Sequence, residues 1–243
     1  MPSNKAGVMG AAGAGGTVGT DYTLLAFGEG ANGRIGDGAT TNRSSPVQIG
    51  LEGKWLSVGA GSQSSMGVKD NNTLWSWGYA GQGGLGNGTT SPNLSEPAQV
   101  GALTDWLRVG EGDFSNFQTC IKTDGTLWIY GFGSFGQLGD GTTVSKSSPV
   151  QIGSETYFEN AELNTGPNNT GYILSTGRLY IWGSNGQGEI GQGDRTGRSS
   201  PTQVGTGTDW AKIRFGASSQ TLAVKTNGTL WSWGNGYGGT LGT

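Results

Sequence analysis

An aromatic residue followed by glycine recurs five times along this 243-residue chain at a nearly constant interval. The glycines of these pairs are 50, 53, 52 and 51 residues apart, an average of about 51.5. Each pair is followed five residues later by a Gly-x-Leu/Ile-Gly tetrapeptide. A fixed period of this length indicates a repeat protein, in which each unit buries its apolar surface against its neighbours. The five pairs are Phe27-Gly28, Trp77-Gly78, Tyr130-Gly131, Trp182-Gly183 and Trp233-Gly234.

Each repeat predicts four short β-strands. The first is Thr-Leu-Trp-Ser-Trp, as at 73–77, where β-favouring residues alternate. The second follows a Ser-x-Pro segment whose proline suits a strand start or an edge, as at 150–152. The third places an aromatic residue three positions before an aliphatic one, as in Trp55 and Val58, and the fourth is represented by 66–69. Before the next first strand, two dipeptides predict a type I′ hairpin with positive φ at both residues: Asp124-Gly125 and Asn227-Gly228.

Four-stranded units at this period predict an all-β protein, specifically a β-propeller of four-stranded blades. Long helices are excluded because 50 of the residues are glycine, and each glycine inside a helix costs about 1 kcal/mol relative to alanine. The repeat domain is expected at 21–243, with four full repeats and a partial fifth, as an open or truncated ring. The incomplete fifth repeat would be accounted for by a chain that continues past Thr243, or by an open arc that a partner completes. The Gly/Ala-rich segment 1–20 is expected to be a tether or disordered.

Composition excludes several kinds of chemistry. The chain has no histidine and a single cysteine, Cys120, so a Cys/His zinc site, a Ser-His-Asp triad and an internal disulfide are excluded. The net charge of −3 argues against a nucleic-acid partner, and no apolar run predicts membrane insertion or a signal peptide. Three Gly-x-Gly-x-x-Gly strings lack the following helix that phosphate binding uses, at 28–33, 131–136 and 234–239. We therefore expect no catalytic, cofactor or metal site, and no enzyme.

The nine tryptophans fall on three positions of the repeat and are therefore interpreted as blade packing, with their indole N–H groups bonded to backbone. A carbohydrate-binding lectin would instead expose them. Cys120 lies inside a predicted strand and is expected to be a small buried residue. The tryptophans in question are Trp55, Trp106 and Trp210; Trp75, Trp128 and Trp231; and Trp77, Trp182 and Trp233.

The segment 125–152 combines Gly-Thr-Leu-Trp, Gly-Gln-Leu-Gly-Asp-Gly-Thr-Thr and Ser-Ser-Pro-Val-Gln-Ile, and it resembles the regulator of chromosome condensation repeat. The resemblance runs from about Leu24 to Gly242 and implies a propeller, which has seven blades in most members. Members include a nucleotide exchange factor that binds chromatin, ubiquitin-ligase modules and a secreted β-lactamase inhibitor, and similar low-charge repeats occur in bacteria and tailed bacteriophages. Family repeats often begin the fourth strand with histidine, which argues against exchange activity here, where the matching residues are Ser64, Phe117 and Gln220.

Aromatic residues outside the repeat consensus are the candidate interaction surface, because exposed aromatic side chains are enriched at the anchors of protein interfaces. Six of them are expected in connections between strands: Tyr79, Phe114, Phe117, Phe132, Phe135 and Tyr237. The alternative is that they cover blade edges. Three basic residues share one position before Ser-Ser-Pro and are expected on one face, where they could meet an acidic partner or form a solvated rim: Arg43, Lys146 and Arg198.

These features predict a non-enzymatic structural or binding propeller whose partners are other proteins. The low charge, the loops rich in Gly, Ser, Thr and Asn, and the phage-like repeats favour a bacteriophage virion component, such as a fibre, appendage or surface decoration. Its loops would then contact virion subunits or a host receptor. The alternatives are a cytoplasmic interaction propeller, acting as an exchange factor or enzyme inhibitor, and a carbohydrate-binding lectin. The sequence leaves the oligomeric state open.

Overall fold

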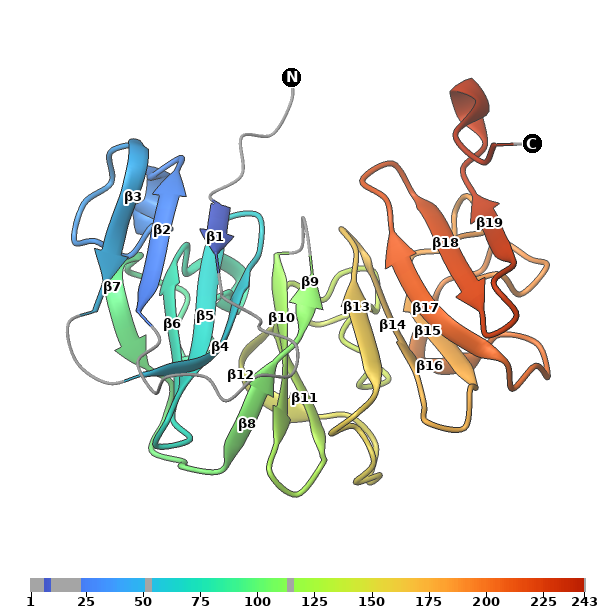
Figure 1. Cartoon of the computed structure of the whole chain (residues 1–243), viewed down its shortest axis with the longest axis horizontal. Helices are drawn as coiled ribbons and strands as arrows, with labels where there is room; N and C mark the ends of the chain where they lie inside the picture. The colour runs from blue at the N-terminus through green and yellow to red at the C-terminus, as the bar shows by residue number, and fades with distance from the viewer. Residues whose placement is uncertain (1–6, 10–22, 51–53, 113–115, 243) are drawn as a thin grey trace.

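The computed structural model describes residues 7–9, 23–50, 54–112 and 116–242, whose strands form five sheets arranged as an arc (Figure 1). We call the sheets blades 1 to 5 in chain order. Blade 1 contains β1 (Gly7–Met9), β2 (Leu24–Gly28) and β3 (Arg43–Ile49). Blade 2 contains β4 (Trp55–Ala60), β5 (Ser64–Lys69), β6 (Leu74–Gly78) and β7 (Leu94–Gln99).

The remaining blades follow the same order. Blade 3 contains β8 (Trp106–Val109), β10 (Phe117–Lys122), β11 (Leu127–Gly131) and β12 (Lys146–Gln151). Blade 4 contains β13 (Glu162–Thr165), β14 (Asn169–Ile173), β15 (Leu179–Gly183) and β16 (Arg198–Gln203), with β9 (Glu111–Gly112) pairing in parallel to β13. Blade 5 contains β17 (Trp210–Phe215), β18 (Gln220–Lys225) and β19 (Leu230–Gly234). The predicted all-β propeller of four-stranded, mainly antiparallel blades is confirmed.

The blades are offset from the sequence repeats. The third and fourth strands of one repeat pair with the first and second strands of the next, so β4 and β5 share a sheet with β6 and β7. Blades 1 and 5 lie at opposite ends of the arc, and in the described part of the chain no hydrogen bond joins them (Figure 1). Of the Gly/Ala-rich segment 1–20, only Gly7–Met9 is described, and it forms β1 against β2. The rest of that segment lies outside the described residues.

The hairpins that join fourth to first strands differ from the prediction. Gly125 has a positive φ of 79°, but Asp124 does not, so the turn is not type I′. Asp124 instead accepts hydrogen bonds at Oδ1 from the backbone N–H and the hydroxyl of Thr126, while the Gly125 N–H donates to the carbonyl of Lys122. The side chain thus forms an Asx turn, which fixes the aspartate conformation and leaves only the glycine left-handed.

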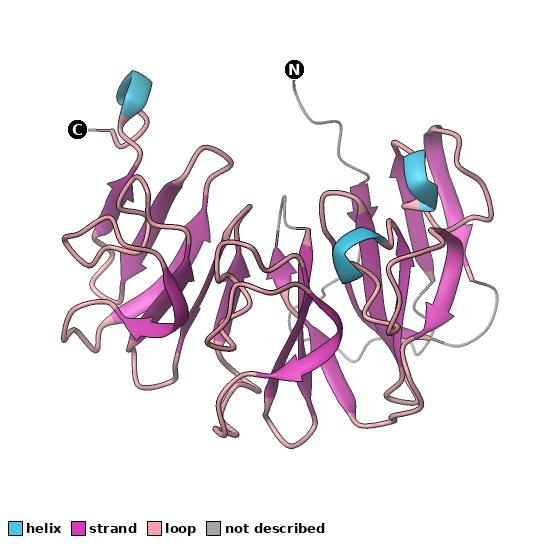
Figure 2. Cartoon of the chain, turned by 180° about the vertical axis from the view of Figure 1, so that it is seen from behind, coloured by secondary structure: helices cyan, strands magenta, loops and turns pink. Residues whose placement is uncertain are grey.

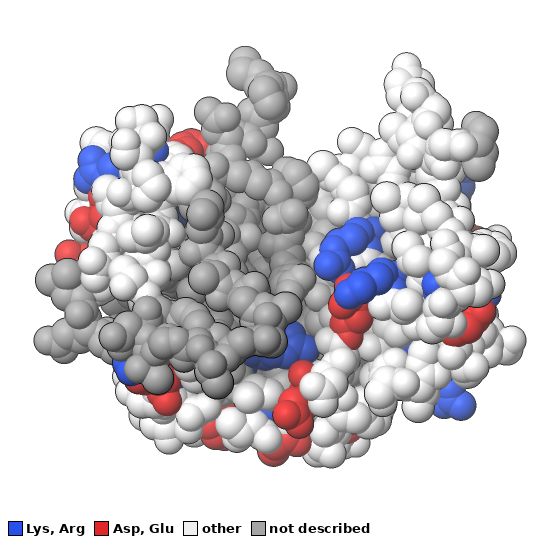
Figure 3. Space-filling model, viewed as in Figure 1, with Lys and Arg blue, Asp and Glu red and all other residues white. Residues whose placement is uncertain are grey.

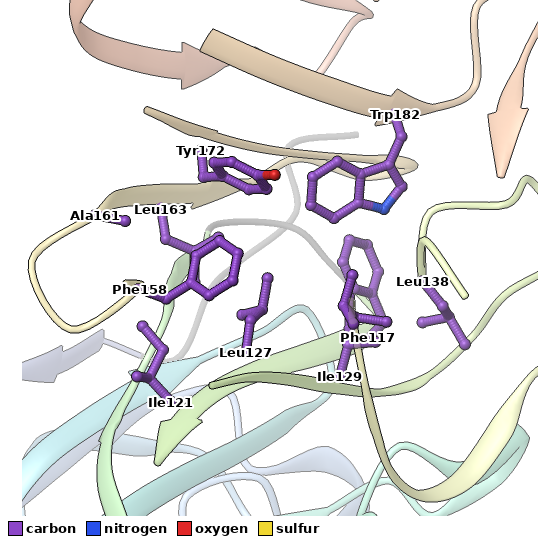
Figure 4. Close-up of a cluster of buried hydrophobic side chains, with 11 residues drawn as sticks. Phe117, Ile121, Leu127, Ile129, Leu138, Phe158, Ala161, Leu163, Tyr172 and Trp182 are labelled. Carbon is purple, nitrogen blue, oxygen red and sulfur yellow. The ribbon is translucent and has the colours of Figure 1, made fainter. Parts of the chain in front are cut away.

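The core lies between the blades. The cluster between blades 3 and 4 joins Phe117 and Ile129 of one sheet to Leu163, Tyr172 and Trp182 of the next, all buried (Figure 4). Clusters of the same kind fill the other contacts between neighbouring blades. A single blade therefore has no core of its own, because each sheet buries its faces against its neighbours.

A shared backbone carbonyl aligns each blade with the next. The second residue of Gly-x-Leu/Ile-Gly supplies it, and in blade 3 this residue is Gln137. Its carbonyl accepts a hydrogen bond of 2.9 Å from the indole N–H of Trp182 and one of 2.8 Å from the hydroxyl of Thr170, both in blade 4. We call this three-residue contact the carbonyl latch. It recurs with Arg34, Ser65 and Trp77, and with Glu189, Thr221 and Trp233.

The contact between blades 2 and 3 departs from this scheme. Tyr130 takes the tryptophan position, and its hydroxyl lies 3.7 Å from the sulfur of Met66 rather than on a carbonyl. Gln118 takes the Ser/Thr position, and its amide donates to the hydroxyl of Ser64 at 3.0 Å. This boundary is therefore held by side-chain pairs instead of the latch.

The outer strand of each of the first four blades carries a proline at an equivalent position. These strands are β3, β7, β12 and β16, each of which ends its sheet; in the last three a serine carbonyl also accepts a backbone N–H from a loop glycine of the preceding blade. Proline lacks a backbone N–H, so it is tolerated at a sheet edge and weakens that edge as a template for further strands. The four prolines are Pro46, Pro97, Pro149 and Pro201.

The carbonyl latch generates a stability prediction. We expect Thr170→Val to lower the free energy of unfolding by about 1 kcal/mol, because it removes one hydrogen bond from a buried carbonyl with little change in side-chain shape. Chemical denaturation with a spectroscopic readout measures the change. Thr202→Val is the matched control, since Val150 occupies the equivalent position in β12, and it should be near neutral. Equal effects of the two variants would contradict a special role for the latch.

Candidate functional site

The connections that follow the first strands gather at one end of the blades, which we call the loop face. Three of them form short 3₁₀ helices, η1 (Ala31–Gly33), η2 (Gly81–Gly83) and η3 (Tyr237–Gly239) (Figure 2). In blades 1 to 3 each connection is tied to the loop that precedes the outer strand. Asn42 accepts from the N–H of Gly30, Asn93 from that of Ala80 and Ser145 from that of Gly133, at 3.0–3.1 Å. These bonds present the two loops of a blade as one unit.

Blade 3 carries a group of apolar side chains on this face. The rings of Phe132 and Phe135 meet edge to face, with centroids 5.8 Å apart. Phe135 is 48% exposed and Val144, on the neighbouring loop, is 60% exposed. The two loops lie against each other here, since a Cβ at Gly133, between the two rings in sequence, would collide with the backbone carbonyl of Val144. We call Phe132, Phe135 and Val144 the apolar loop cluster.

Other blades fold the same loops with polar residues. Phe135 is replaced by Asn32, Gln82 and Gln187 in three other copies, and Val144 by Thr41 in blade 1. In blade 3 the N–H of Phe135 is held by the Gln137 side chain at 2.9 Å, as Glu189 holds that of Gln187 at 2.8 Å in blade 4. The backbone of the turn therefore does not depend on the side chain of Phe135, whose ring contacts only Phe132 of the same loop and otherwise faces solvent.

The other aromatic residues predicted for the interaction surface lie in different places. Phe117 was expected in a connection but lies in β10, fully buried between blades 3 and 4, so its assignment to an interaction surface is wrong. Tyr79 is half-buried and its ring lies across Gly81 of its own loop. Tyr237 is 88% exposed in η3, on a different blade from the apolar loop cluster. Phe114 lies outside the described residues.

The three basic residues occupy equivalent places on the loop face, but each pairs with an aspartate of its own repeat. Lys146 lies 2.9 Å from Asp140, Arg198 lies 2.7 Å from Asp194, and Arg43 pairs likewise with Asp37. In blade 2 both members change together, because Asn87 and Leu94 stand at these positions. Each basic residue therefore stabilises the loop of its own repeat through an ion pair with an aspartate.

The aspartates also accept hydrogen bonds from their turns. Asp140 accepts from the N–H and the hydroxyl of Thr142. Burial raises the pKa of its carboxyl, but the hydrogen bonds from Lys146 and Thr142 outweigh that effect and hold the pKa below its ordinary value. Most of the surface in Figure 3 is uncharged, with charged groups in small sets that include both signs.

The tryptophans only partly follow the packing interpretation. Five are buried, but Trp231, on the edge strand β19, is 51% exposed. The indole N–H groups of Trp77, Trp182 and Trp233 donate to backbone carbonyls, as predicted. The indole N–H groups of Trp75, Trp128 and Trp231 instead donate to a threonine hydroxyl two residues earlier. Those of Trp55, Trp106 and Trp210 have no hydrogen-bond partner. The tryptophan set therefore does not form an exposed lectin surface.

The described residues contain no group of three or more His, Cys, Asp and Glu side chains placed to hold a metal ion. Cys120 is buried as predicted, and burial raises the pKa of its thiol, which keeps it protonated. In that same part of the chain, no helix is long and apolar enough to cross a membrane.

Sequence reasoning missed Val144. The signal was available in the Asp-Gly to Ser-Ser-Pro loops, which have the same length in repeats 1 and 3, so Val144 aligns with Thr41. A side chain that is apolar in one copy and polar in the other marks a position whose residue is not set by folding.

A family model described as the Regulator of chromosome condensation (RCC1) repeat matches residues 23–68, 124–160 and 176–223, more than half of the chain. The chain is 28% identical over 229 residues to the ultraviolet-B receptor UVR8 of Arabidopsis thaliana, covering 90% of this chain and 50% of the receptor. It is 29% identical over 192 residues to the E3 ubiquitin-protein ligase HERC2 of Homo sapiens, covering 77% of this chain and 4% of the ligase. The chain thus spans half or less of these relatives.

Solved structures share the fold at lower identity. Human WBSCR16 is 19% identical with a TM-score of 0.74, over 92% of this chain and 60% of that one. Prp20p of Saccharomyces cerevisiae, described together with its binding properties to Gsp1p and histones, is 17% identical with a TM-score of 0.74, over 90% of this chain and 56% of that one. Both superpose on an arc of this chain and extend beyond it.

The ion pair between Asp140 and Lys146 predicts that substitutions of these two residues have coupled effects on stability. We expect Lys146→Leu alone to lower the free energy of unfolding at pH 7 by about 0.5–1 kcal/mol, because Asp140 loses its ion pair. The double variant Asp140→Asn/Lys146→Leu, which copies blade 2, should recover most of that loss. Denaturation of wild type and of the single and double variants measures the coupling. A double variant whose loss is the sum of the two single losses would contradict it.

The same pair predicts a pH dependence. Because the pKa of Asp140 is lowered in the folded state, its stabilisation is present above its unfolded pKa of about 3.9 and is lost as the pH falls below that value. Wild type should therefore lose more stability than the double variant between pH 5 and pH 2. Parallel pH profiles of unfolding would contradict this.

Proposed function

The chain belongs to the Regulator of chromosome condensation (RCC1) repeat family, and we propose that it is a non-enzymatic, protein-binding propeller that docks partners on its loop face. The observation that carries this proposal is the apolar loop cluster of Phe132, Phe135 and Val144. Phe135 and Val144 expose apolar surface at positions where other copies of the repeat carry polar residues such as Gln82 and Thr41, and Phe132 packs edge to face on Phe135. Burial of that surface by a partner would be favourable, and aromatic anchors are typical of interface hot spots.

The scaffold suits this role because the cluster sits on loops that are fixed before binding. The hydrogen bond from the Gly133 N–H to Ser145 ties the two loops, and Gln137 holds the N–H of Phe135. The carbonyl of the same Gln137 belongs to the latch between blades 3 and 4. A partner would therefore meet a preorganised surface, which reduces the conformational entropy lost on binding.

For the biological setting, we propose a bacteriophage virion component whose loops contact other virion subunits or a host receptor. Low charge, loops rich in small polar residues and near-consensus repeats support it. A cellular regulatory propeller is the second candidate, favoured by relatives such as the ultraviolet-B receptor UVR8 and the ubiquitin ligase HERC2. Mass spectrometry of purified particles distinguishes the two, since the virion proposal requires this chain among the particle proteins in stoichiometric amounts.

The docking surface is tested by a variant that gives blade 3 the polar residues of the other blades. Phe135→Gln/Val144→Thr copies Gln82 and Thr41, so we expect unfolding by denaturant to change by less than about 0.5 kcal/mol. Affinity capture from source-cell lysate and from purified particles should then recover a partner with wild type and at least tenfold less of it with this variant.

The matched control is Leu103→Thr, which removes an exposed apolar side chain from the connection between β7 and β8. It should recover the partner as wild type does. Undiminished capture by the double variant, or equal loss with Leu103→Thr, would contradict docking at the apolar loop cluster.

A further inference from the structure

The end of the blades opposite the loop face, which we call the hairpin face, has one arrangement in blades 2, 3 and 5. In blade 3 the Lys122 ammonium lies 3.0 Å from Asp105 and 4.4 Å from the ring centroid of Trp128. The Trp128 indole donates to Thr126 at 2.8 Å, and the Thr126 hydroxyl donates to Asp124. Lysine stacks on two tryptophans in blades 2 and 5 as well. Most of the charged and hydroxyl groups of this arrangement are thus paired with one another, although Asp105 Oδ1 and the Trp106 indole N–H are buried without a hydrogen-bond partner.

Blade 4 replaces this arrangement completely. Leu174 stands at the lysine position, Tyr180 at the Trp128 position and Arg178 at the Thr126 position. Phe158 takes the place of Trp106, and Tyr157 takes that of Asp105. No residue of the lysine–tryptophan arrangement is kept, so this hairpin face differs in chemistry from those of the neighbouring blades.

Part of the replacement is a rebuilt core. Tyr172 stands where blades 2, 3 and 5 have Gly67, Cys120 and Ala223, and it fills the space left by the smaller Phe158. Their rings meet edge to face with centroids 4.9 Å apart, and Tyr172 stacks on Tyr180 at 5.0 Å. This exchange of volumes accounts for the buried aromatics.

The exposed residues are not explained by core packing. Tyr157 is 46% exposed, with its ring 5.1 Å from that of Phe158, and Arg178 and Glu155 are exposed beside it. Burial, then the neighbouring Glu155 carboxylate and the Tyr180 phenol, raise the pKa of Tyr157, while Arg178 acts in the opposite direction. In blade 3 the equivalents of Tyr157, Tyr180 and Arg178, which are Asp105, Trp128 and Thr126, meet around Lys122, and this equivalence places the three residues at the same end of blade 4. The Tyr180 hydroxyl donates to the Gln203 side chain at 3.4 Å.

We propose that this surface, made of Tyr157, Tyr180, Arg178, Glu155 and Gln203, binds a neutral oligosaccharide. An exposed phenol ring provides an apolar face for the C–H groups of a sugar. The guanidinium and phenol donate hydrogen bonds to sugar hydroxyls, and the carboxylate and amide accept them. One cation and one anion sum to zero charge, which favours a neutral ligand over an acidic or basic one. The inference goes beyond the proposed protein docking, since it concerns the opposite end of the blades.

The test uses isothermal titration calorimetry with the full chain and defined probes. The neutral probes are linear hexasaccharides of glucose, mannose and N-acetylglucosamine, and the charged probe is a sulfated heparin hexasaccharide. We expect saturable binding of at least one neutral probe to wild type. Tyr157→Ala should weaken that binding at least tenfold, and Arg178→Thr, which installs the residue of the other blades, should weaken it severalfold.

The control variant is Tyr237→Ala, which removes a more exposed tyrosine elsewhere and should leave binding unchanged. Thermal unfolding of each variant checks that the fold is retained, which is expected because the substituted side chains are exposed. The proposal is overturned if no neutral hexasaccharide binds at millimolar concentration, or if binding survives Tyr157→Ala. It is also overturned if the sulfated probe binds more tightly, or if Tyr157 is needed only for capture of a protein partner.

Discussion

Three of the four contacts between neighbouring blades depend on one backbone carbonyl. A carbonyl offers two lone pairs, and in the latch both are used by the next blade, by an indole and by a hydroxyl. The following glycine is part of the same device, since a Cβ at Gly139 would collide with the Trp182 indole nitrogen. Much of the glycine content thus serves the fit between sheets. Where Tyr130 replaces tryptophan, the contact is made by different groups, and the arc continues.

The sequence allowed the strands, the repeat and the propeller to be predicted, because each rests on local patterns such as the alternation around Trp75 and Trp77. The Asp124-Gly125 and Asn227-Gly228 hairpins also predicted that the fourth strand of one repeat pairs with the first strand of the next, and this pairing is observed, although with a different turn. Phe117 was nevertheless misplaced. The fourth strand starts three residues before its most regular part, so a residue that looked like a connection lies inside the core.

Comparison of equivalent positions in the repeats separates substitutions that compensate each other structurally from substitutions that do not. Asp140 and Lys146 become Asn87 and Leu94 in another blade, and the two exchanges compensate each other within one turn. In blade 4 the larger Tyr172 likewise compensates for the smaller Phe158, which stands where other blades have tryptophan, and the two rings pack on each other. Phe135 and Val144 are not compensated in this way: Phe135 meets only the Phe132 ring of its own loop, and both side chains stay largely exposed. That contrast, rather than exposure alone, separates the loop surface from the many exposed residues around it.

The prolines of the outer strands affect how readily one molecule can pair with another through its strand edges. A row of unpaired strand edges around an arc would ordinarily allow molecules to fuse side by side through main-chain pairing. Proline offers no amide for such pairing on β3, β7, β12 and β16, which makes these edges poorer templates for a strand of another molecule. Edge-to-edge pairing is therefore disfavoured at four of the blades, whereas β19 ends the fifth sheet with no proline in its strand.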